Sequence, residues 1–533
     1  MLSIVDHSVS PPRIDLPRRY NAAHDLLERN LAAGRAEKLA YIDDAGRYTF
    51  GELAERVNRA ANALTALGLQ PEDRIMVALH DTIDFPSVFL GAIKAGIIPI
   101  ATNTQLTPDD YRFMLEDSRA KALVVSAPLL ETFAPAISAA AYLRHVVVSG
   151  ERAQSQAAEH HALGALMDHA ESAFTPAATT ADDPCFWLYS SGSTGQPKGT
   201  VHIHSSVIHT AELYARPILG LTEQDVVFSA AKLFFAYGLG NSLTFPLAVG
   251  ATAILMAERP TPEAVFKRLI TLQPTVFYGV PTLYAALLAS PELPAREALG
   301  LRLCTSAGEA LPAEIGQRFT QHFGVEVLDG IGSTEMLHIF LSNRPGEVRY
   351  GTTGKPVPGY EIRLCDEAGA EIRDGALGEL QIKGPSAAIM YWNNRRQSTA
   401  TFVGPWTRAG DQYSVDADGY YIHGGRSDDM LKVSGQYVSP IEVEGALLTH
   451  STVLEAAVIG VMDAEGLVKP LAVVVLKPGV TVTPDLEAML KAHVKTRLAP
   501  HKYPRWISFV PELPRTATGK IQRYKLRGEY GPK

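Results

Sequence analysis

The amino-acid sequence alternates short β-branched runs with helical segments, and it does so in two separate stretches. In the first stretch, strands are predicted at residues 74–79, 97–101, 123–126 and 146–149, with a helix at 86–96. In the second, strands are predicted at residues 226–229, 251–256, 275–279 and 301–306, with a helix at 262–272. Strands that alternate with helices form a parallel sheet with helices on both faces. The alternation therefore predicts an α/β protein whose main body consists of two doubly wound subdomains.

The run TFGE at residues 49–52 is typical of a helix start. The Thr49 side chain can accept a hydrogen bond from the backbone N–H of Glu52, whose carboxylate can in turn accept one from the backbone N–H of Thr49. Apolar residues such as Val57 and Leu64 follow at helical spacing, and Gly68 stands where a helix commonly ends. These features predict a helix that precedes the first parallel strand.

The later part of the chain has a different pattern. Short strands separated by turn segments are expected at residues 361–364, 379–383 and 419–423, which predicts a small β-barrel packed on the α/β body. Beyond residue 426, helices at 440–449 and 484–498 and strands at 456–459 and 471–476 predict a smaller α+β domain.

The length of the chain requires more than one domain. A single hydrophobic core stops growing near about 250–300 residues, and this chain has 533. We expect an N-terminal domain at residues 1–427 and a C-terminal domain at 428–533.

Composition excludes several classes of protein. The net charge of −8 lacks the basic surplus of a nucleic-acid binder. The longest apolar stretches, such as residues 247–257, are shorter than the roughly 18–20 residues that span a bilayer, so no membrane partner is expected. The N-terminal segment carries Asp6, Pro11 and Pro12 where a secretory signal needs an apolar core. The three cysteines form no CxxC pair, so a cytoplasmic, reducing location is expected.

The strongest local signal is the run YSSGSTGQPKG at residues 189–199. Glycines let backbone N–H groups approach an anion closely, hydroxyls donate to phosphate oxygens, and the lysine adds a positive charge. The apolar run at residues 185–189 leads into it, which argues against a simple surface linker. The pattern GxxxxGK[ST] of a Walker A loop has no match in the chain. The run therefore predicts a phosphate-binding loop of another kind.

This run resembles the signature of the adenylate-forming superfamily, which includes acyl-CoA synthetases, peptide-synthetase adenylation domains and luciferases. Further motifs of that family follow in the family's order. They are SAGEAL at 306–311, DGIGSTE at 329–335, TRAGD at 407–411, GRSD at 425–428 with KVSG at 432–435, and PRTATGK at 514–520. The resemblance spans residues 189–520 and implies ATP and coenzyme A as co-substrates and Mg²⁺ as the metal.

The resemblance implies a two-step reaction in which a carboxylate first displaces pyrophosphate from ATP and a thiol then attacks the acyl-adenylate. A carboxylate and a triphosphate repel each other, so the site must supply positive charge and donors in advance. Lys520 is expected to do so as a catalytic residue. Thr334 is expected to donate to the α-phosphate and Glu335 to hold Mg²⁺, which prefers one or two carboxylates together with phosphate oxygens.

The resemblance also places the nucleotide and coenzyme A. Asp411 and Arg426 are expected at the ribose, and Gly308, Glu309 and Asp329 near adenine. The residues expected to bind these co-substrates are Ser190, Ser191, Gly192, Ser193, Thr194, Gly195, Lys198, Gly308, Glu309, Asp329, Thr334, Asp411, Arg426, Lys432, Ser434 and Gly435.

Asp428 matches the family's hinge, about which the smaller, mobile C-terminal domain is expected to turn after adenylation. That turn would withdraw Lys520 and bring the loop that holds Ser434 and Gly435 to the acyl group. A glycine at 435 leaves room for a pantetheine arm beside the backbone. Ser434 stands where several relatives have lysine, and Tyr437 where many have Gln or Asn.

The run KLFFAYGLGN at residues 232–241 occupies the family's substrate-side motif and, with the run at 437–444, resembles the benzoate-CoA ligases among the aryl-CoA ligases. The residues expected to line the acid pocket are Phe235, Ala236, Tyr237, Ala307, Gly330, Gly332, His338 and Ile339. A Tyr and a His with glycine walls suit a flat ring better than a long chain. Position 235 is Phe. This disfavours an amino acid as the substrate, because its ammonium group would need an acidic residue at that position.

These observations predict a ligase that activates benzoate to benzoyl-CoA in aromatic-acid degradation and releases AMP and pyrophosphate. Three alternatives remain open: a substituted benzoate such as 2-aminobenzoate or 4-hydroxybenzoate, or a cyclic alkene acid; an enzyme that loads an aryl acid onto a carrier protein; and a binding homologue without activity. Lys520 also resembles a site of regulatory acetylation, which would make a lysine acetyltransferase a partner. The chain is expected to be a monomer or a homodimer.

Overall fold

The computed structural model describes residues 1–150, 160–190, 197–373, 375–426, 429–433, 436–463, 467–499, 502–515 and 521–531. They form two compact units. The first consists of Met1–Leu311, Ile315–Ile362 and Ile382–Arg408, and the second of Pro312–Glu314, Arg363–Gln381 and Ala409–Lys533. The domain boundary expected between residues 427 and 428 stays a prediction, as does the mobility of the C-terminal domain.

The first unit contains an eight-stranded sheet in the order β22-β11-β10-β6-β5-β7-β8-β9. Its strands are β5 Arg74–Ala78, β6 Ile98–Ala101, β7 Ala122–Ser126, β8 His145–Ser149, β9 His160–Ala162, β10 Pro184–Ser190, β11 Lys198–Ile203 and β22 Met390–Tyr391. Neighbouring strands from β10 to β9 are parallel, whereas β11 and β22 are antiparallel to their neighbours. The predicted parallel sheet of the first subdomain is therefore confirmed.

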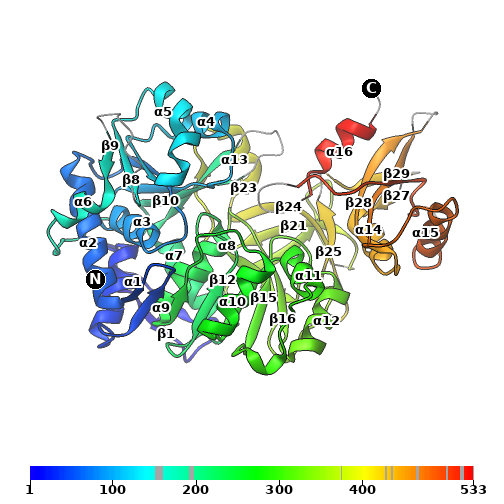
Figure 1. Ribbon diagram of the computed structural model, residues 1–533, viewed down its shortest axis with the longest axis horizontal. Helices are drawn as coiled ribbons and strands as arrows, with labels where there is room; N and C mark the ends of the chain where they lie inside the picture. The colour runs from blue at the N-terminus through cyan, green and yellow to red at the C-terminus, as the bar shows by residue number, and fades with distance from the viewer. Residues whose placement is uncertain are drawn as a thin grey trace. The chain divides into compact units, whose positions relative to one another are not determined.

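Helices cover both faces of this sheet (Figure 1). Met76 and Ala78 of β5 pack against α4 Pro108–Ser118 and α5 Leu130–Ala139, while α3 Asp84–Lys94 contacts β5 and β6 and packs on α2 Phe50–Ala66. A Cβ on Gly91 would lie only 2.8 Å from that of Ala60, so the two helices approach too closely for a larger residue. The capping box of Thr49 and Glu52 begins α2, as the sequence predicts.

The second sheet of this unit has nine strands in the order β18-β17-β16-β15-β14-β12-β13-β3-β4. Their bounds are β3 Leu39–Ile42, β4 Arg47–Thr49, β12 Val226–Ser229, β13 Thr252–Ile254, β14 Val276–Gly279, β15 Leu303–Ser306, β16 Val327–Gly332, β17 Ile339–Ser342 and β18 Lys355–Pro356. The strands from β16 to β3 are parallel to their neighbours in this order. This sheet is the second predicted α/β layer.

Different kinds of helix cover the two faces of the second sheet. On one face Phe228 and Phe277 pack against α10 Pro262–Leu272, α11 Pro281–Ala289 and α12 Ala313–Phe323. On the other lie α8 Ala236–Leu239, the π-helical η3 Gly240–Thr244 and α9 Phe245–Val249, with η3 and α9 in contact with the strands. A second π-helical segment, η2 Ala211–Ala215, follows α7 His204–Thr210. Single π-helical turns inside helices frequently mark functional sites.

Short antiparallel strands follow, as the sequence predicts. They are β19 Glu361–Cys365, β20 Glu371–Ile372, β21 Gly378–Lys383, β23 Phe402–Val403, β24 Trp406–Val415 and β25 Tyr421–Arg426. Strand β19 pairs with β20, β23 with the start of β24, and β25 with the remainder of β24. Helix α13 Arg395–Thr401 precedes β23.

The C-terminal part of the second unit is α+β, as predicted. Strands β28 Val453–Met462, β29 Val468–Leu476 and β30 Trp506–Phe509 form a three-stranded sheet. Helices α14 Pro440–Leu448 and α15 Leu486–Lys495 pack on one face, and α16 Arg523–Tyr530 packs on the other. The hairpin of β26 Leu431–Val433 and β27 Gln436–Val438 stands before α14. No helix in the described ranges is both long and apolar enough to span a membrane.

Candidate active site

The predicted phosphate motif lies at the end of a β-hairpin in the first unit. Strands β10 and β11 are antiparallel and pair Ser190 with Lys198, so the two ends of the motif stand side by side. The Ser190 hydroxyl oxygen is buried and has no hydrogen-bond partner among the described residues. Five further residues of the prediction lie outside the described residues, so their role stays a prediction: Ser191, Gly192, Ser193, Thr194 and Gly195.

A short chain of contacts joins the motif lysine to the predicted metal ligand. The Nζ of Lys198 lies 3.4 Å from the Tyr391 hydroxyl and 4.4 Å from the centre of the Tyr391 ring. That hydroxyl donates to Oε1 of Glu335 at 2.7 Å. Lys198 and Glu335 are thus brought together through Tyr391, which the sequence analysis missed. No local signal could have found Tyr391, because it lies 193 residues from Lys198 and reaches the site through the pairing of β22 with β11.

The loop between β16 and β17 holds Thr334 and Glu335. Its backbone is fixed from outside the loop: His202 Nε2 donates to the Thr334 carbonyl at 2.7 Å, and the Ala388 N–H donates to the Glu335 carbonyl at 2.7 Å. Burial lowers the pKa of His202 to about 4, so its ring is neutral at physiological pH. His202 is a second residue that sequence reasoning missed. These two contacts hold the loop through backbone carbonyls and do not use the side chains of Thr334 and Glu335.

The residues predicted near adenine follow β15 and lie on β16. Asp329 is only 4% exposed; its Oδ2 accepts from the Leu311 N–H at 3.3 Å, and its Oδ1 has no partner among the described residues. Burial raises the pKa of this carboxyl well above its usual value. Gly308 has a φ of +93°, a conformation that favours glycine, and Glu309 follows it. The Ser306 hydroxyl before them is likewise buried without a described partner.

Three aromatic rings surround His338, one of the predicted acid-pocket residues. Its ring centre lies 4.4 Å from that of Phe245, 5.5 Å from Tyr214 and 5.6 Å from Tyr237. Its Nε2 donates to the Tyr237 carbonyl at 3.3 Å, and its Nδ1 is buried without a partner in the described part of the chain. Burial lowers the pKa of His338 to about 3, so the aromatic cluster carries no imidazolium charge.

Glycines allow the backbone to approach this cluster. A Cβ on Gly332 would lie 2.5 Å from the His338 carbonyl oxygen, and one on Gly240 would lie 2.3 Å from His338 Cδ2. A Cβ on Gly330 would come within 3.2 Å of Ile339 Cγ2. Gly330, Gly332, His338 and Ile339 are therefore brought together by the antiparallel pairing of β16 with β17.

The remaining predicted pocket residues lie on two neighbouring elements. Phe235 is the residue before α8 and Ala236 is its first residue, so both directly precede Tyr237, which contacts His338. Ala307 is buried directly after β15. The last residue of β15, Ser306, pairs with Asp329, which precedes Gly330 in β16. The structure thus brings Tyr237 and the β16–β17 residues of the predicted set to His338, with Ala236 and Ala307 as their neighbours, while the role of every member, Phe235 included, stays a proposal.

Three pocket residues escaped sequence reasoning. Tyr214 lies on η2 and Phe245 follows η3, so both π-helical segments carry or adjoin a ring of the cluster. Thr305 Oγ1 lies 2.5 Å from the Tyr237 hydroxyl and thereby orients that ring. Local hydrophobic patterns identify apolar faces of helices and strands but not π-helical turns, so the sequence carried no usable signal for Tyr214 and Phe245. Thr305 lies 68 residues from Tyr237, so no local pattern connects the two.

The predicted ribose residues are neighbours in the second unit. Strand pairing places Asp411 of β24 opposite Arg426 of β25, with Arg426 Nη1 3.5 Å from Asp411 Oδ2. His423 Nε2 lies 3.4 Å from the other carboxylate oxygen. Two oxygens on a carboxylate held from both sides suit a pair of ribose hydroxyls, and His423 is an addition to the predicted set.

The residues predicted for the hinge, the coenzyme A loop and the catalytic lysine lie mostly outside the described part of the chain. Asp428, Ser434, Gly435 and Lys520 all lie in gaps of the described ranges. Lys432 belongs to β26, and its role also stays a prediction. An isolated bridge pairs Arg515 with Ile521, so the two flanks of the segment that contains Lys520 lie side by side.

The fold and these motifs define an enzyme that binds a nucleotide and activates an acid through it. Residues 27–392 match the family model of the AMP-binding enzymes, and residues 442–520 match that of the AMP-binding enzyme C-terminal domain. The chain belongs to the AMP-binding enzyme family. The resemblance inferred from the motifs is therefore confirmed.

Individual relatives narrow the comparison to ligases of aromatic acids. The chain is 64% identical over 528 residues to a benzoate–CoA ligase of Thauera aromatica, covering 99% of both chains. It is 48% identical over 516 residues to a 4-hydroxybenzoate–CoA/benzoate–CoA ligase of Rhodopseudomonas palustris, covering 96% of this chain and 94% of that protein.

Solved structures agree with this comparison. A benzoate CoA ligase from Burkholderia xenovorans LB400 superposes with a TM-score of 0.89 at 59% identity, covering 95% of this chain and 100% of that chain. An anthranilate CoA ligase, AuaEII, in complex with anthranoyl-AMP superposes with a TM-score of 0.92 at 41% identity, covering 97% and 98%. The predicted fold, with a large N-terminal and a small C-terminal domain of an adenylate-forming enzyme, is confirmed.

Proposed function

We propose that this chain is an AMP-forming acid-thiol ligase that converts benzoate to benzoyl-CoA through a benzoyl-adenylate. One observation carries the choice of benzoate: the 64% identity to a benzoate–CoA ligase, which covers 99% of both chains. The cluster of Tyr214, Tyr237, Phe245 and His338 is consistent with it, because aromatic rings stack on or edge against a flat ring.

In the first step, the benzoate carboxylate attacks the α-phosphorus of ATP and pyrophosphate leaves. The hydroxyls and N–H groups of the 189–199 motif, with Lys198, would bind the phosphates, and the Thr334 hydroxyl would donate to the α-phosphate. Buried polar atoms without described partners at Ser190, Ser306 and Asp329 fit a site built to receive a polar ligand. Lys520 would balance the charge of the approaching carboxylate.

Glu335 is the carboxylate that would hold Mg²⁺. The Tyr391 hydroxyl orients its Oε1, and a site made of one carboxylate with phosphate oxygens is the kind that Mg²⁺ commonly occupies. When bound, the ion would reduce the charge of the phosphates and draw the triphosphate into line. Asp411 and Arg426 would take the ribose hydroxyls, and Gly308, Glu309 and Asp329 the adenine.

In the second step, the thiol of coenzyme A attacks the benzoyl carbonyl and AMP leaves. A turn about Asp428 would withdraw Lys520 and present the loop of Lys432, Ser434 and Gly435 to the acyl group. The reaction is proposed to run in the cytoplasm. Acetylation of Lys520 would remove its charge and switch off the first step, which makes a lysine acetyltransferase a proposed partner.

The choice of acid is tested by a panel of benzoate, 2-aminobenzoate, 4-hydroxybenzoate and cyclohex-1-ene-1-carboxylate, assayed by pyrophosphate release. We expect kcat/KM for benzoate to exceed that for each other acid by about tenfold or more, because one polar substituent in an apolar pocket changes binding by roughly 1–3 kcal/mol. A higher kcat/KM for 4-hydroxybenzoate or 2-aminobenzoate would assign the pocket to that acid instead. Acylation of a carrier protein with no thioester formed from free coenzyme A would contradict the assigned acceptor.

A further inference from the structure

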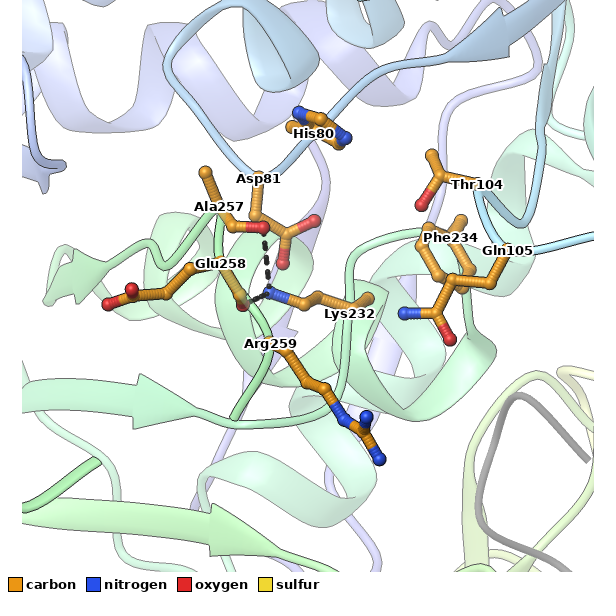
Figure 2. Close-up of a pocket in the computed structure, with 9 residues that line it drawn as sticks. All are labelled: His80, Asp81, Thr104, Gln105, Lys232, Phe234, Ala257, Glu258 and Arg259. Atoms are coloured by element: carbon orange, nitrogen blue, oxygen red, sulfur yellow. Dashed lines mark hydrogen bonds between the residues drawn. The ribbon is translucent and has the colours of Figure 1, made fainter. Parts of the chain in front are cut away.

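Three segments that are far apart in the sequence meet directly beside residues 235–237, which are assigned to the acid pocket. Asp81 follows β5 of the first sheet, Lys232 follows β12 of the second sheet, and residues 256–258 follow β13. Figure 2 shows the Lys232 side chain reaching towards the backbone of the third segment, with the Asp81 carboxylate beside it. A cavity of about 290 Å³ is lined by residues from all three segments. The junction therefore ties the two α/β subdomains together next to the acid pocket.

The Lys232 ammonium group donates hydrogen bonds to backbone carbonyls. The side chain belongs to a residue that is only 8% exposed, and its Nζ donates to the carbonyl of Glu258 at 2.6 Å, to that of Ala257 at 3.4 Å and to that of Met256. An ammonium group has three N–H donors, so these three carbonyls occupy all of them. Lys232 is thus a fixed anchor between its own loop and the end of β13.

Asp81 anchors the same loop from the opposite side. It is 4% exposed, and its two carboxylate oxygens lie 3.3 and 3.2 Å from the Leu233 nitrogen, whose N–H donates to them. Burial raises the pKa of Asp81 to about 6, while the charge of Lys232 acts in the opposite direction. Burial lowers the pKa of Lys232, and the charge of Asp81 opposes that decrease. Each charge therefore favours the ionised form of the other at a buried location, where an isolated charge would be costly.

The anchored residues immediately precede the acid-pocket side chains. The Lys232 carbonyl accepts from the Phe235 N–H at 3.0 Å, which closes a turn before α8. A Cβ on Gly238 would lie 2.0 Å from that same carbonyl oxygen, so the first turn of α8 sits directly on the anchored turn. A displacement of the turn at Lys232 would therefore move Phe235 and Tyr237 with it.

We propose that Lys232 and Asp81 are positioning residues that fix the loop of residues 232–237 and thereby determine how tightly the acid pocket binds its aromatic acid. This inference rests on the function proposed above, because that function assigns residues 235–237 to the acid. Neither side chain is required to touch the substrate. Their effect is specific to the acid because the anchored turn adjoins the acid-pocket residues, whereas the phosphate motif lies on a different hairpin.

The test compares the variants Lys232→Met and Asp81→Asn with the wild type in the full reaction. Methionine keeps the length of the side chain but leaves three carbonyls without a donor, and asparagine keeps the shape of Asp81 but removes its charge. We expect KM for benzoate to rise about tenfold or more in Lys232→Met and by a smaller factor in Asp81→Asn, since small displacements in a binding site have large effects. KM for ATP should change by less than about threefold.

The exposed Lys267 of α10 provides the matched control, because Lys267→Met removes a lysine from the same unit without touching the loop. Thermal unfolding shows which variants fold, and if Lys232→Met does not fold, Asp81→Asn decides. An unchanged KM for benzoate in a folded variant, or equal increases in KM for benzoate and ATP, would overturn the proposal. If the wild type fails to use benzoate, the proposed function is wrong, and the same KM comparison is made with the acid that the wild type prefers.

Discussion

Replacing Lys520 by alanine is expected to lower the rate of benzoyl-adenylate formation by about 100- to 1000-fold, which corresponds to the loss of one preorganised electrostatic contact in a transition state. The reason is the charge balance of the first step, in which a carboxylate must approach a triphosphate. Thioester formation from supplied benzoyl-AMP should remain close to the wild-type rate, because the second step has no such encounter. Single-turnover assays of the two half-reactions measure both effects.

The control for this experiment is Lys525→Ala, which removes an exposed lysine from α16, close to Lys520 in sequence. It should leave both half-reactions unchanged. Equal losses in the two half-reactions of Lys520→Ala would contradict the assigned role, because they would indicate a general defect of the C-terminal domain rather than a missing charge.

Glu335→Gln is expected to lower the adenylation rate on the order of 100-fold at a fixed Mg²⁺ concentration. Glutamine retains a carbonyl oxygen that can accept the bond from the Tyr391 hydroxyl, so the local structure should persist while the negative charge is lost. A titration with Mg²⁺ should therefore show a higher half-saturating concentration in the variant than in the wild type.

Glu361→Gln is the matched control, because Glu361 is exposed on β19 and pairs with Lys383. Its Mg²⁺ titration should coincide with that of the wild type. If Glu335→Gln lost activity with no change in its Mg²⁺ requirement, Glu335 would have a role other than holding the metal.

Much of the fold follows from local patterns in the sequence. The capping box at Thr49 predicts the start of α2, and the helix predicted at residues 262–272 is α10 Pro262–Leu272. Strand β12 Val226–Ser229 also has the predicted bounds. These elements are predictable because a cap or an apolar periodicity lies within the element itself. The π-helical turns at η2 and η3 depend on packing and have no such local signature.

The candidate site divides in the same way. Ser190, Lys198, Thr334 and Glu335 stand in short motifs, so the sequence alone is enough to predict them as site residues. Their supporting residues come from remote segments: Tyr391 reaches Glu335 across 56 residues, and the two sheets of the first unit each supply one anchor of the Lys232–Asp81 junction. Such partners depend on tertiary pairing, which one sequence does not reveal.

The most direct test of the proposed activity follows both steps in one reaction. The enzyme is incubated with benzoate, ATP and Mg²⁺, and products are identified by mass spectrometry before and after coenzyme A is added. We predict benzoyl-AMP in an amount close to that of the enzyme before the addition, and its conversion to benzoyl-CoA with release of AMP afterwards. Formation of benzoyl-CoA with ADP and phosphate, or benzoyl-AMP that coenzyme A does not consume, would contradict the account.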